Sequence, residues 1–395
     1  MIKAIPYGKQ NITQADIDSV VNTLKSDFLT QGPKIAEFEQ AFAKYVGAKY
    51  AVLVGNATEA LHISALSLGV GASSVALTTP ISFVASANCI AYCGGKIDFV
   101  DIDSNTALMD LNTLEKKLSS KPSGYYSGVI PVDFAGLPVD LERLRNIANK
   151  YNLWIIEDAC HSPGGYFIDS AGQKHYCGNG QFADVSVFSF HPVKHIACGE
   201  GGMITTNNEN LYHKLCTLRT HGITKDPLLM QQNHGGWYYE MQDLGYNYRM
   251  PDILASLGLS QLNRANEGIA RRIKIAKKYD EAFKNTPINN NVSKYREGNA
   301  YHLYIIQVEQ RKALYDFLRK HHIFAQVHYI PIHLMPYYRQ FGWKEGDMPM
   351  AEQYYEHCLS LPMYPTLTNN EQNKVIDLIF HFLKDNNHHE RNSQM

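Results

Sequence analysis

Short apolar runs alternate with longer amphipathic stretches between about residues 50 and 206. Runs of about four to eight apolar residues bounded by turn residues are typical of buried strands, and the stretches between them have helical periodicity. The predicted strands are Tyr50–Val54, Ser74–Leu77, Lys96–Asp101, Gly128–Val132, Leu153–Glu157, Val185–Phe190 and Gly202–Thr206. This alternation predicts an α/β fold, a mainly parallel sheet with helices on both faces.

The pattern changes in the second half of the chain. Residues 225–242 are aromatic and aperiodic and contain glycine, which is typical of a functional loop. One long helix is predicted from Ile253 to about Asn285, and we interpret its basic residues, Arg272 among them, as mainly a solvated face. Further segments predict a smaller α+β domain: strands at Tyr301–Val308 and Phe324–His328, a helix at Leu314–Lys320, and a last amphipathic helix with Val375, Ile379, Phe382 and Leu383.

The patterns divide the chain into three parts. We expect an N-terminal tail and large domain over residues 1–250, and a linking helix and small C-terminal domain over residues 251–385. Residues 386–395 are polar, and we expect a disordered tail there.

Composition narrows the class of protein. With 37 basic and 38 acidic residues, the formal charge is −1, so we expect no binding to nucleic acid or membranes. No apolar run is long enough to span a bilayer, and the N-terminus lacks a signal-peptide core. The seven cysteines are scattered and odd in number, which favours free thiols in a reducing cytoplasm.

Lys194 is the most informative residue. It follows the predicted buried strand that ends at Phe190, and a glycine-rich stretch comes after it. Desolvation at such a position lowers the pKa of an amine and makes it nucleophilic toward an aldehyde. A surface lysine in a loop is the ordinary alternative, and the flanking residues argue against it.

Asp158 ends the predicted strand before that one, at the edge of an α/β sheet where ligands bind. A carboxylate flanked by apolar residues needs a partner, because burying it alone is costly. The pyridinium nitrogen of pyridoxal 5′-phosphate (PLP) is such a partner, and a carboxylate beside it makes the ring an electron sink. The alternative is that Asp158 caps the next helix.

A third feature is the turn Gly55-Asn56-Ala57-Thr58 between a strand and a helix. Either Asn56 or Thr58 can cap that helix. Free N–H groups at a helix N-terminus favour phosphate, although most such turns hold none. The signal becomes informative together with Lys194 and Asp158.

These motifs together resemble the DegT/DnrJ/EryC1/StrS family of sugar aminotransferases. The matching segments follow the family's order over about residues 25–361; they are Gly55–Thr58, Pro80–Ala85, Glu157–His161, Ser189–Lys194, Gly199–Gly202 and Gly245–Met250. The resemblance implies the aspartate-aminotransferase-like fold (fold type I), PLP as cofactor, and a homodimer with shared active sites.

The resemblance also implies a role for each matching position. Lys194, Asp158 and His161 are the expected catalytic residues, with His161 near the 3′ oxygen of the ring. Phe83 would stack on the pyridine ring, although a core phenylalanine is the alternative. The phosphate would contact Ala57, Thr58, Ser189 and Asn247, the last from the neighbouring subunit with Arg249 beside it. The expected substrate contacts are Tyr7, Asp27, Phe28, Leu29, Thr30, Ala57, Ser189, Asn247, Gln326, Val327, His328 and Tyr329.

Within the family, the N-terminal Ile5–Gly8, the Phe28–Pro33 stretch and Gln326–His333 most resemble the transaminases of pseudaminic acid biosynthesis. That implies L-glutamate as donor and, as acceptor, a UDP-linked 4-keto-6-deoxy-N-acetylhexosamine of L-arabino configuration. Spacing alone cannot distinguish one amino sugar from another, so another nucleotide-linked keto sugar is the main alternative. Lys194 argues against the dehydratase branch, which has histidine there, and a non-catalytic PLP-binding regulator is a further alternative.

The chain has 17 histidines, a number that raises the question of a metal site. Cys160, His161, His175, Cys177, His191 and His195 are close in sequence. Their spacing does not form the paired pattern of a zinc site, so we expect no metal.

Overall fold

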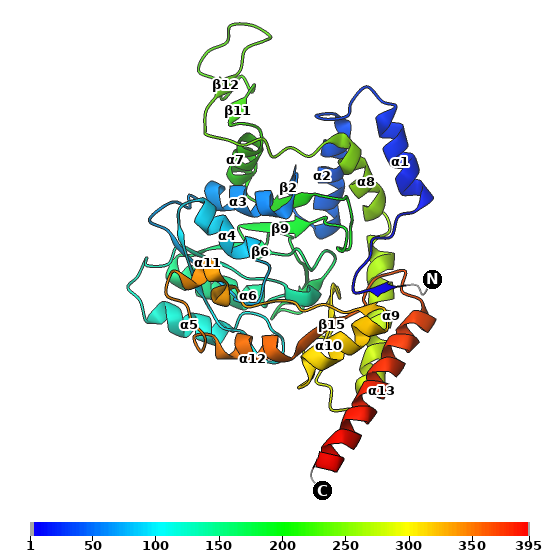
Figure 1. The fold of residues 1–395 in the computed structure, drawn as a ribbon. Coiled ribbons are helices and arrows are strands. Elements are labelled where there is room, and N and C mark those ends of the chain that lie inside the picture. Colours follow the sequence, from blue (N-terminus) through cyan, green and yellow to red (C-terminus); the bar gives the residue numbers. More distant parts are fainter. Residues whose placement is uncertain (1–3, 394–395) are drawn as a thin grey trace.

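A seven-stranded sheet is the centre of the molecule (Figure 1). The computed structural model describes residues 4–393, with side chains described as far as residue 385. The strand order is β2-β10-β9-β6-β5-β3-β4; β10 runs antiparallel to its neighbours and the other pairs are parallel. The strands are β2 (Tyr50–Val54), β3 (Val75–Thr78), β4 (Lys96–Phe99), β5 (Gly128–Ile130), β6 (Trp154–Asp158), β9 (Val185–Ser189) and β10 (Gly202–Thr206). The predicted mainly parallel α/β sheet is confirmed.

Helices cover both faces of the sheet. Helices α3 (Ala57–Ser67), α4 (Ala85–Tyr92) and α7 (Glu209–Arg219) share one apolar cluster with the sheet. On the other face, α5 (Leu111–Ser119) and α6 (Leu141–Tyr151) pack beside β3, β5 and β6, while α2 (Pro33–Val46) and α8 (Asp252–Leu262) pack beside β2, β9 and β10. Helix α1 (Gln14–Leu24) lies against α8. Burial on both faces explains why these strands are continuous apolar runs.

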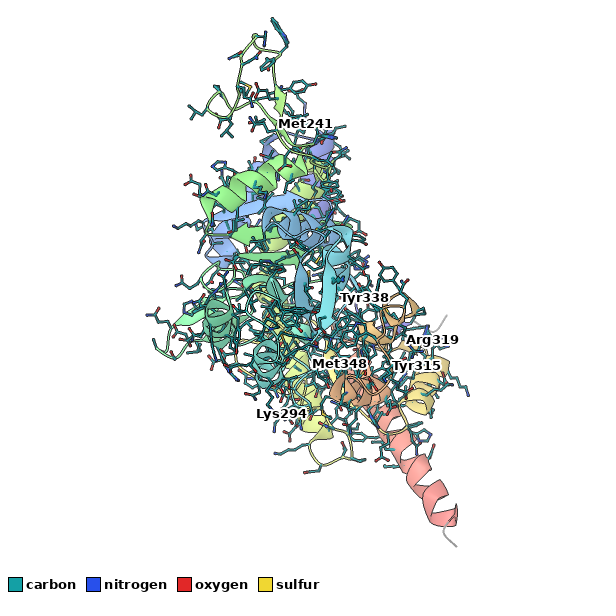
Figure 2. The ribbon with its side chains drawn as sticks, turned by 90° about the vertical axis from the view of Figure 1, so that its left-hand side faces the viewer. Met241, Lys294, Tyr315, Arg319, Tyr338 and Met348 are labelled. Atoms are coloured by element: carbon teal, nitrogen blue, oxygen red, sulfur yellow. The ribbon has the colours of Figure 1, made fainter. Side chains whose placement is uncertain are left out.

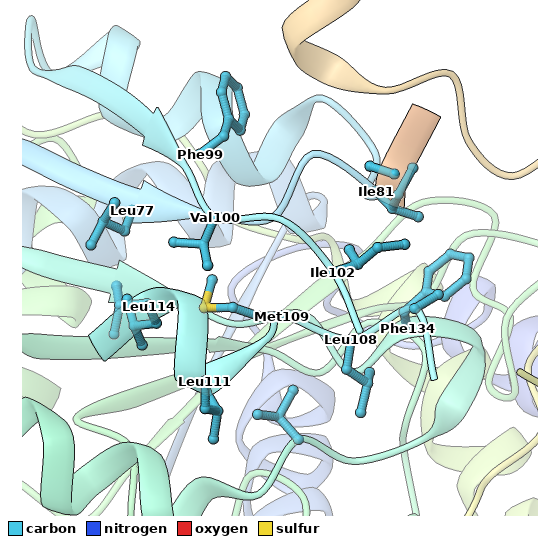
Figure 3. Packing of buried hydrophobic residues seen from close by; sticks show 14 of the residues in the cluster. Leu77, Ile81, Phe99, Val100, Ile102, Leu108, Met109, Leu111, Leu114 and Phe134 are labelled. Carbon is cyan, nitrogen blue, oxygen red and sulfur yellow. The ribbon is translucent and has the colours of Figure 1, made fainter. Parts of the chain in front are cut away.

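The largest apolar cluster fills the space between β3, β4 and α5 (Figure 3). Leu77 and Phe99 come from the sheet, and Leu114 comes from the helix; all three are fully buried. Phe134, in the short 3₁₀ helix η1 (Phe134–Gly136), closes the cluster toward the carboxyl ends of the strands. This packing fixes the loop after β5, which carries part of the site described below.

The second half of the chain forms the expected α+β domain. Strands β13 (Tyr304–Gln307) and β15 (Cys358–Leu361) pair antiparallel and share an apolar cluster with three helices. Those helices are α9 (Ala265–Phe283), α10 (Arg311–Lys320) and α13 (Asn369–Ser393). Strand β14 (Ile323–Phe324) pairs with the N-terminal strand β1 (Ile5–Pro6). The segment with η2 (Ile332–Leu334), α11 (Pro336–Arg339) and α12 (Pro349–His357) packs on the large domain.

The two ends of the chain lie differently from what the sequence suggested. Ile5 is buried in the smaller domain's core, although the sequence assigned the N-terminus to the large domain. Helix α13 continues through residues 386–393, where the sequence predicted disorder. The remainder of that predicted tail, residues 394–395, and residues 1–3 of the N-terminus lie outside the described residues. Pairing between segments far apart in sequence decides where these ends lie, so local pattern does not reveal it.

The predicted long helix from Ile253 to Asn285 is wrong, because two helices occupy it. The chain turns at Asn263 and Arg264, and the Arg264 guanidinium donates to both carboxylate oxygens of the buried Asp16 in α1. The interpretation of a solvated basic face also fails at Arg272. That side chain is buried, and its Nη1 donates to the carbonyls of Tyr301, His302 and Met363.

Two hairpins complete the fold. β7 (Tyr166–Ile168) pairs with β8 (Lys174–Tyr176), a hairpin that the sequence analysis missed. β11 (Ile223–Thr224) pairs with β12 (Glu240–Met241), and the loop between them projects from the body of the molecule (Figure 1). Met241 lies on this projection in the second view (Figure 2). Among the described residues, no helix is long and apolar enough to cross a membrane.

Candidate active site

Three adjacent strands bring the predicted residues to one edge of the sheet. Asp158 is the last residue of β6 and lies opposite Val187 of the neighbouring β9. Lys194 follows the end of β9, and Gly202 begins the antiparallel β10 beside it. The parallel pairing of β6 and β9 thus places the lysine and the aspartate on the same edge.

Lys194 is half-buried, and its backbone N–H donates to the carbonyl of His191. Burial lowers the pKa of its amine to about 8, and the nearby Arg272 charge acts in the same direction. Asp158 and the Cys160 thiol oppose that shift. The desolvated setting predicted from the sequence is confirmed, so far more of this amine is neutral and nucleophilic near pH 8 than of an ordinary lysine.

Asp158 is 5 % exposed, and its two oxygens have different partners. Oδ2 accepts a hydrogen bond of 2.6 Å from the Ser86 hydroxyl of α4, and Oδ1 accepts one of 3.2 Å from the backbone N–H of Cys160. A turn and a hairpin follow β6, not a helix, so the helix-capping alternative is wrong. Ser86 was missed by the sequence analysis, because nothing in the pattern of α4 marks it.

The predicted phosphate turn has the expected geometry. Asn56 caps α3 by accepting from the backbone N–H of Glu59 at 2.9 Å, so the N–H groups of Ala57 and Thr58 lie at the open end of the helix. Gly202 lies directly against this turn, since a Cβ there would be 2.6 Å from the Asn56 carbonyl. Ser189 is buried at the end of β9. These groups form a donor-rich corner beside Lys194.

Aromatic side chains form the opposite wall. Phe83 is 59 % exposed, so the alternative of a core phenylalanine is wrong. Its ring centroid lies 6.4 Å from that of Tyr329, which comes from the C-terminal half of the chain. The Tyr329 hydroxyl is 3.3 Å from Nε2 of His161. Two halves of the sequence therefore meet at this wall.

His161 is held as a neutral ring. Its Nδ1 accepts from the backbone N–H of Ala135 at 3.3 Å, so the proton is on Nε2, which then donates to Tyr329. Burial lowers the pKa of His161 well below its ordinary value, and the Lys194 charge adds to this effect. The His302 ring lies 4.3 Å from His161 between ring centroids. His302 was another residue that the sequence analysis missed.

The remaining predicted substrate residues fall into two groups. The Tyr7 ring lies against the His328 ring in a tilted arrangement, with 5.0 Å between centroids, and Nδ1 of His328 is 2.8 Å from the Ser360 hydroxyl. Gln326 and Val327 precede this pair on the same segment. By contrast, Asp27, Phe28, Leu29 and Thr30 are exposed in the connection between α1 and α2, and no recorded contact joins them to Lys194 within the described residues.

Asn247 is exposed, in a segment that runs past the phosphate turn. The carbonyl of the next residue, Tyr248, accepts from the backbone N–H of Gly55 at 3.1 Å. Tyr246 and Tyr248 both contact His62 of α3, so alternation along the segment turns Asn247 to the other side.

The chain has a mainly parallel sheet, followed by a smaller α+β domain. A buried aspartate and a desolvated lysine lie on adjacent strand ends of that sheet. This combination defines the aspartate-aminotransferase-like class of PLP-dependent transferases. Residues 10–380 match the model of one family within this class. The chain belongs to the DegT/DnrJ/EryC1/StrS aminotransferase family.

Individual relatives agree with this assignment. The chain is 36% identical over 387 residues to a UDP-4-amino-4,6-dideoxy-N-acetyl-beta-L-altrosamine transaminase of Campylobacter jejuni, covering 96% of this chain and 98% of the relative. It is 36% identical over 389 residues to the spore coat polysaccharide biosynthesis protein SpsC of Bacillus subtilis, covering 96% and 97%. Among solved structures, Helicobacter pylori PseC, an aminotransferase involved in the biosynthesis of pseudoaminic acid, superimposes with a TM-score of 0.87 at 29% identity, covering 97% of this chain and 100% of that one.

Proposed function

We propose that this protein is a PLP-dependent aminotransferase that moves an amino group from L-glutamate to C4 of UDP-2-acetamido-2,6-dideoxy-β-L-arabino-hex-4-ulose. The product would be UDP-4-amino-4,6-dideoxy-N-acetyl-β-L-altrosamine, an intermediate of pseudaminic acid biosynthesis. The observation that carries the proposal is the pair of Lys194 and Asp158 on adjacent strand ends. The names of the Campylobacter relative and of Helicobacter PseC support the choice of sugar.

The residues present fit PLP. Asn56 caps α3 through Glu59 and leaves the first N–H groups of that helix open, as a phosphate requires, and the side-chain-free Gly202 packs closely against the same turn. Asp158 has one oxygen held by Ser86 and lies where it can face a pyridinium nitrogen. The solved structures of the similar Spr1654 aminotransferase of Streptococcus pneumoniae, which include a PLP-form and a PMP-form, support the same cofactor.

Each residue has a role in this proposal. When bound, PLP supplies an electron sink for the carbon that loses its proton. Lys194 would hold the cofactor through Nζ and carry the proton between the donor's Cα and the cofactor. Asp158 would hold a proton on the ring nitrogen, and neutral His161 would orient Tyr329 beside Phe83. The exposed Phe83 side chain would stack on the pyridine ring of PLP.

We also propose a homodimer in which Asn247 reaches the phosphate site of the neighbouring subunit. Two apolar surfaces support a second copy as the partner. The projecting loop between β11 and β12 carries Leu228, which is 92 % exposed, and Trp237, which is 76 % exposed. Helix α1 and the following turn expose Ile17, Leu24 and Phe28. Apolar side chains this exposed are typical of an interface.

A different nucleotide-linked keto sugar is the second candidate, since SpsC is as similar as the Campylobacter transaminase. The test is incubation of the purified protein with L-glutamate, PLP and a panel of UDP- and dTDP-linked 4-keto sugars, with products identified by mass and NMR. We expect amination of the L-arabino UDP sugar alone. Amination of only the D-xylo epimer or a dTDP sugar would contradict the proposed L-arabino substrate, while the protein would still be a sugar aminotransferase. No amination of any sugar would favour the regulatory alternative.

A further inference from the structure

Two carboxyl groups lie in contact inside the protein, close to the candidate active site. Asp133 follows β5 and is 0 % exposed, while Glu157 precedes Asp158 on β6 and is 1 % exposed. One oxygen from each of them and the Sγ of the buried Cys177 all lie within 4.8 Å of one another. Because successive side chains on a strand point to opposite faces, Glu157 faces away from the side on which Asp158 acts.

The hydrogen bonds of this pair leave one oxygen without a partner. Asp133 accepts from the backbone N–H of Val139 at 2.9 Å and from the Ser162 hydroxyl at 2.6 Å. Oε2 of Glu157 accepts from the backbone N–H of Gly178 at 3.0 Å and from the Ser186 hydroxyl at 2.5 Å. Within the described residues, Oε1 of Glu157 has no donor. The groups that donate to the pair are two backbone N–H groups, two hydroxyls and the Cys177 thiol, and none of them is a cation.

Two ionised carboxylates in this setting would repel each other without solvent to screen them, which is costly. We propose that Asp133 and Glu157 share one proton, with Glu157 donating from Oε1 to Asp133, and that this acid–carboxylate pair positions His161. Burial, reinforced by the Asp133 charge, raises the pKa of Glu157 well above its ordinary value. Burial also raises the pKa of Asp133, to about 6. Both directions agree with a retained proton.

The pair is connected to His161 along two short paths. Ser162, the residue after His161, donates directly to Asp133. The bond from Val139 to Asp133 closes the loop 133–139, and Ala135 in that loop has a positive φ of 60°. Ala135 is the residue whose N–H fixes the tautomer of His161. Only the catalytic role of His161 in this inference rests on the proposed function.

A metal ion is the other way to neutralise such a cluster. Within the described residues, the group offers three ligands, Asp133, Glu157 and Cys177. Structural zinc sites almost always have four ligands, and the carboxyl oxygens here already accept hydrogen bonds from backbone N–H groups and hydroxyls of the protein. A single proton is the simpler solution, and the two can be distinguished by experiment.

Glu157→Gln tests the shared proton on the holoenzyme without relying on activity. The amide oxygen of the glutamine can take the place of Oε2 and keep the bonds from Gly178 and Ser186. Its NH₂ group can take the place of the protonated Oε1 and donate to Asp133. We expect infrared difference spectra at neutral pH, wild type minus Glu157→Gln, to contain the carbonyl band of a protonated carboxylic acid that shifts in D₂O. Absence of this band, or one stoichiometric metal ion by elemental analysis that Glu157→Gln abolishes, would overturn the proposal.

Glu157→Met tests the positioning role, because it removes the donor and leaves Asp133 unpaired. We expect kcat to fall about 10- to 100-fold with KM for the keto sugar little changed, since small displacements of a catalytic group have such effects. Glu157→Gln should restore kcat to within about twofold of wild type. The ¹⁵N signals of His161, assigned with a His161→Gln variant, should show the Nε2–H tautomer in wild type and Glu157→Gln. Only in Glu157→Met should they show a loss of that tautomer.

Asp280→Asn is the matched control. Asp280 is a partly buried carboxyl with a raised pKa in the smaller domain, where it accepts from Tyr304 and Asn290. Its variant should change the melting temperature without changing the His161 signals. Unchanged kcat and unchanged His161 signals in a folded Glu157→Met protein would reject positioning. Should Glu157→Met fail to fold, the infrared result and the kcat of Glu157→Gln decide the proposal.

Discussion

The amine of Lys194 shows how a single side chain acquires its chemistry from its surroundings. Its pKa is lowered to about 8 chiefly by burial, and Arg272, a buried like charge whose Nη1 donates to backbone carbonyls, acts in the same direction. At pH 8 about half of the Lys194 amine is neutral and can attack an aldehyde, whereas an ordinary lysine, with a pKa of about 10.4, is almost fully protonated at that pH.

The first prediction follows from this pKa. The rate at which cofactor-free protein captures PLP should rise with pH through a midpoint near 8, because Nζ reacts only after losing its proton. Stopped-flow absorbance measures this rate, and borohydride should fix the cofactor on the peptide that contains Lys194. Lys194→Ala should keep the fold and lose both the label and turnover. A label on a different lysine would contradict the assignment.

Asp158 supports a second prediction at this scale. Asp158→Asn should still bind PLP, because Ser86 and the donors at the N-terminus of α3 remain, but turnover should fall on the order of a thousandfold. Loss of a charge that faces the ring nitrogen in a dry site costs several kcal/mol. Steady-state kinetics with L-glutamate measure the effect, and Ser86→Ala should give a smaller loss. Near-normal turnover of Asp158→Asn would show that the carboxylate only stabilises the turn after β6, by accepting the hydrogen bond from the Cys160 N–H.

At the scale of the element, β10 is the strand whose direction shapes the site. It runs antiparallel between β2 and β9, so its first residue, Gly202, meets the N-terminus of α3. A side chain there would lie 2.6 Å from the Asn56 carbonyl and 2.8 Å from the Ala57 nitrogen. Backbone atoms cannot move aside as a flexible side chain can, so glycine is required at this contact.

Gly202→Ala should therefore weaken PLP binding about tenfold or more, since overpacking of this kind costs about 1–3 kcal/mol. Equilibrium titration of cofactor-free protein with PLP measures the change. Gly71→Ala is the matched control, because an added Cβ at Gly71 meets no atom within 4 Å and should leave PLP affinity unchanged. Equal affinity of the Gly202→Ala protein and wild type would place the phosphate elsewhere.

The break between α8 and α9 has its cause in another element. Arg264 turns away from a continuous helix to bond Asp16 of α1, and the redirected α9 then places Arg272 under the turn at Tyr301 and His302. That turn holds His302 against His161. An ion pair at the helix junction thus contributes to the geometry of the site.

At the scale of the whole molecule, the proposed dimer gives the last prediction. Lys194→Ala and Asn247→Asp subunits should each be inactive alone, the second because a carboxylate would repel the phosphate. If Asn247 completes the neighbour's site, each mixed dimer contains one intact site, so random mixing should restore about a quarter of wild-type activity. Activity after subunit exchange, verified by mass spectrometry of tagged chains, is the measurement. No recovery would assign Asn247 to its own subunit's site or to none.

Local pattern was sufficient to predict the sheet and to place Lys194 and Asp158 at its carboxyl edge. The strands around Val54, Asp158 and Ser189 are continuous apolar runs because both faces of the sheet are buried, and that burial is visible in the sequence. Lys194 and Asp158 could be chosen because each follows a strand at the edge where ligands bind. The family resemblance supplied Phe83, His161 and Asn247, which no spacing rule selects.

Only the tertiary structure decided the contacts between distant segments. The antiparallel direction of β10, the pairing of β1 with β14 and the break before Arg264 all depend on partners far away in sequence. Burial of Arg272 and the contact of Asp133 with Glu157 depend on them as well, because charged residues are ordinarily solvated and become buried only where packing brings partners together. The sequence alone determined which residues are candidates for the chemistry, and the long-range packing determined which groups surround and orient them.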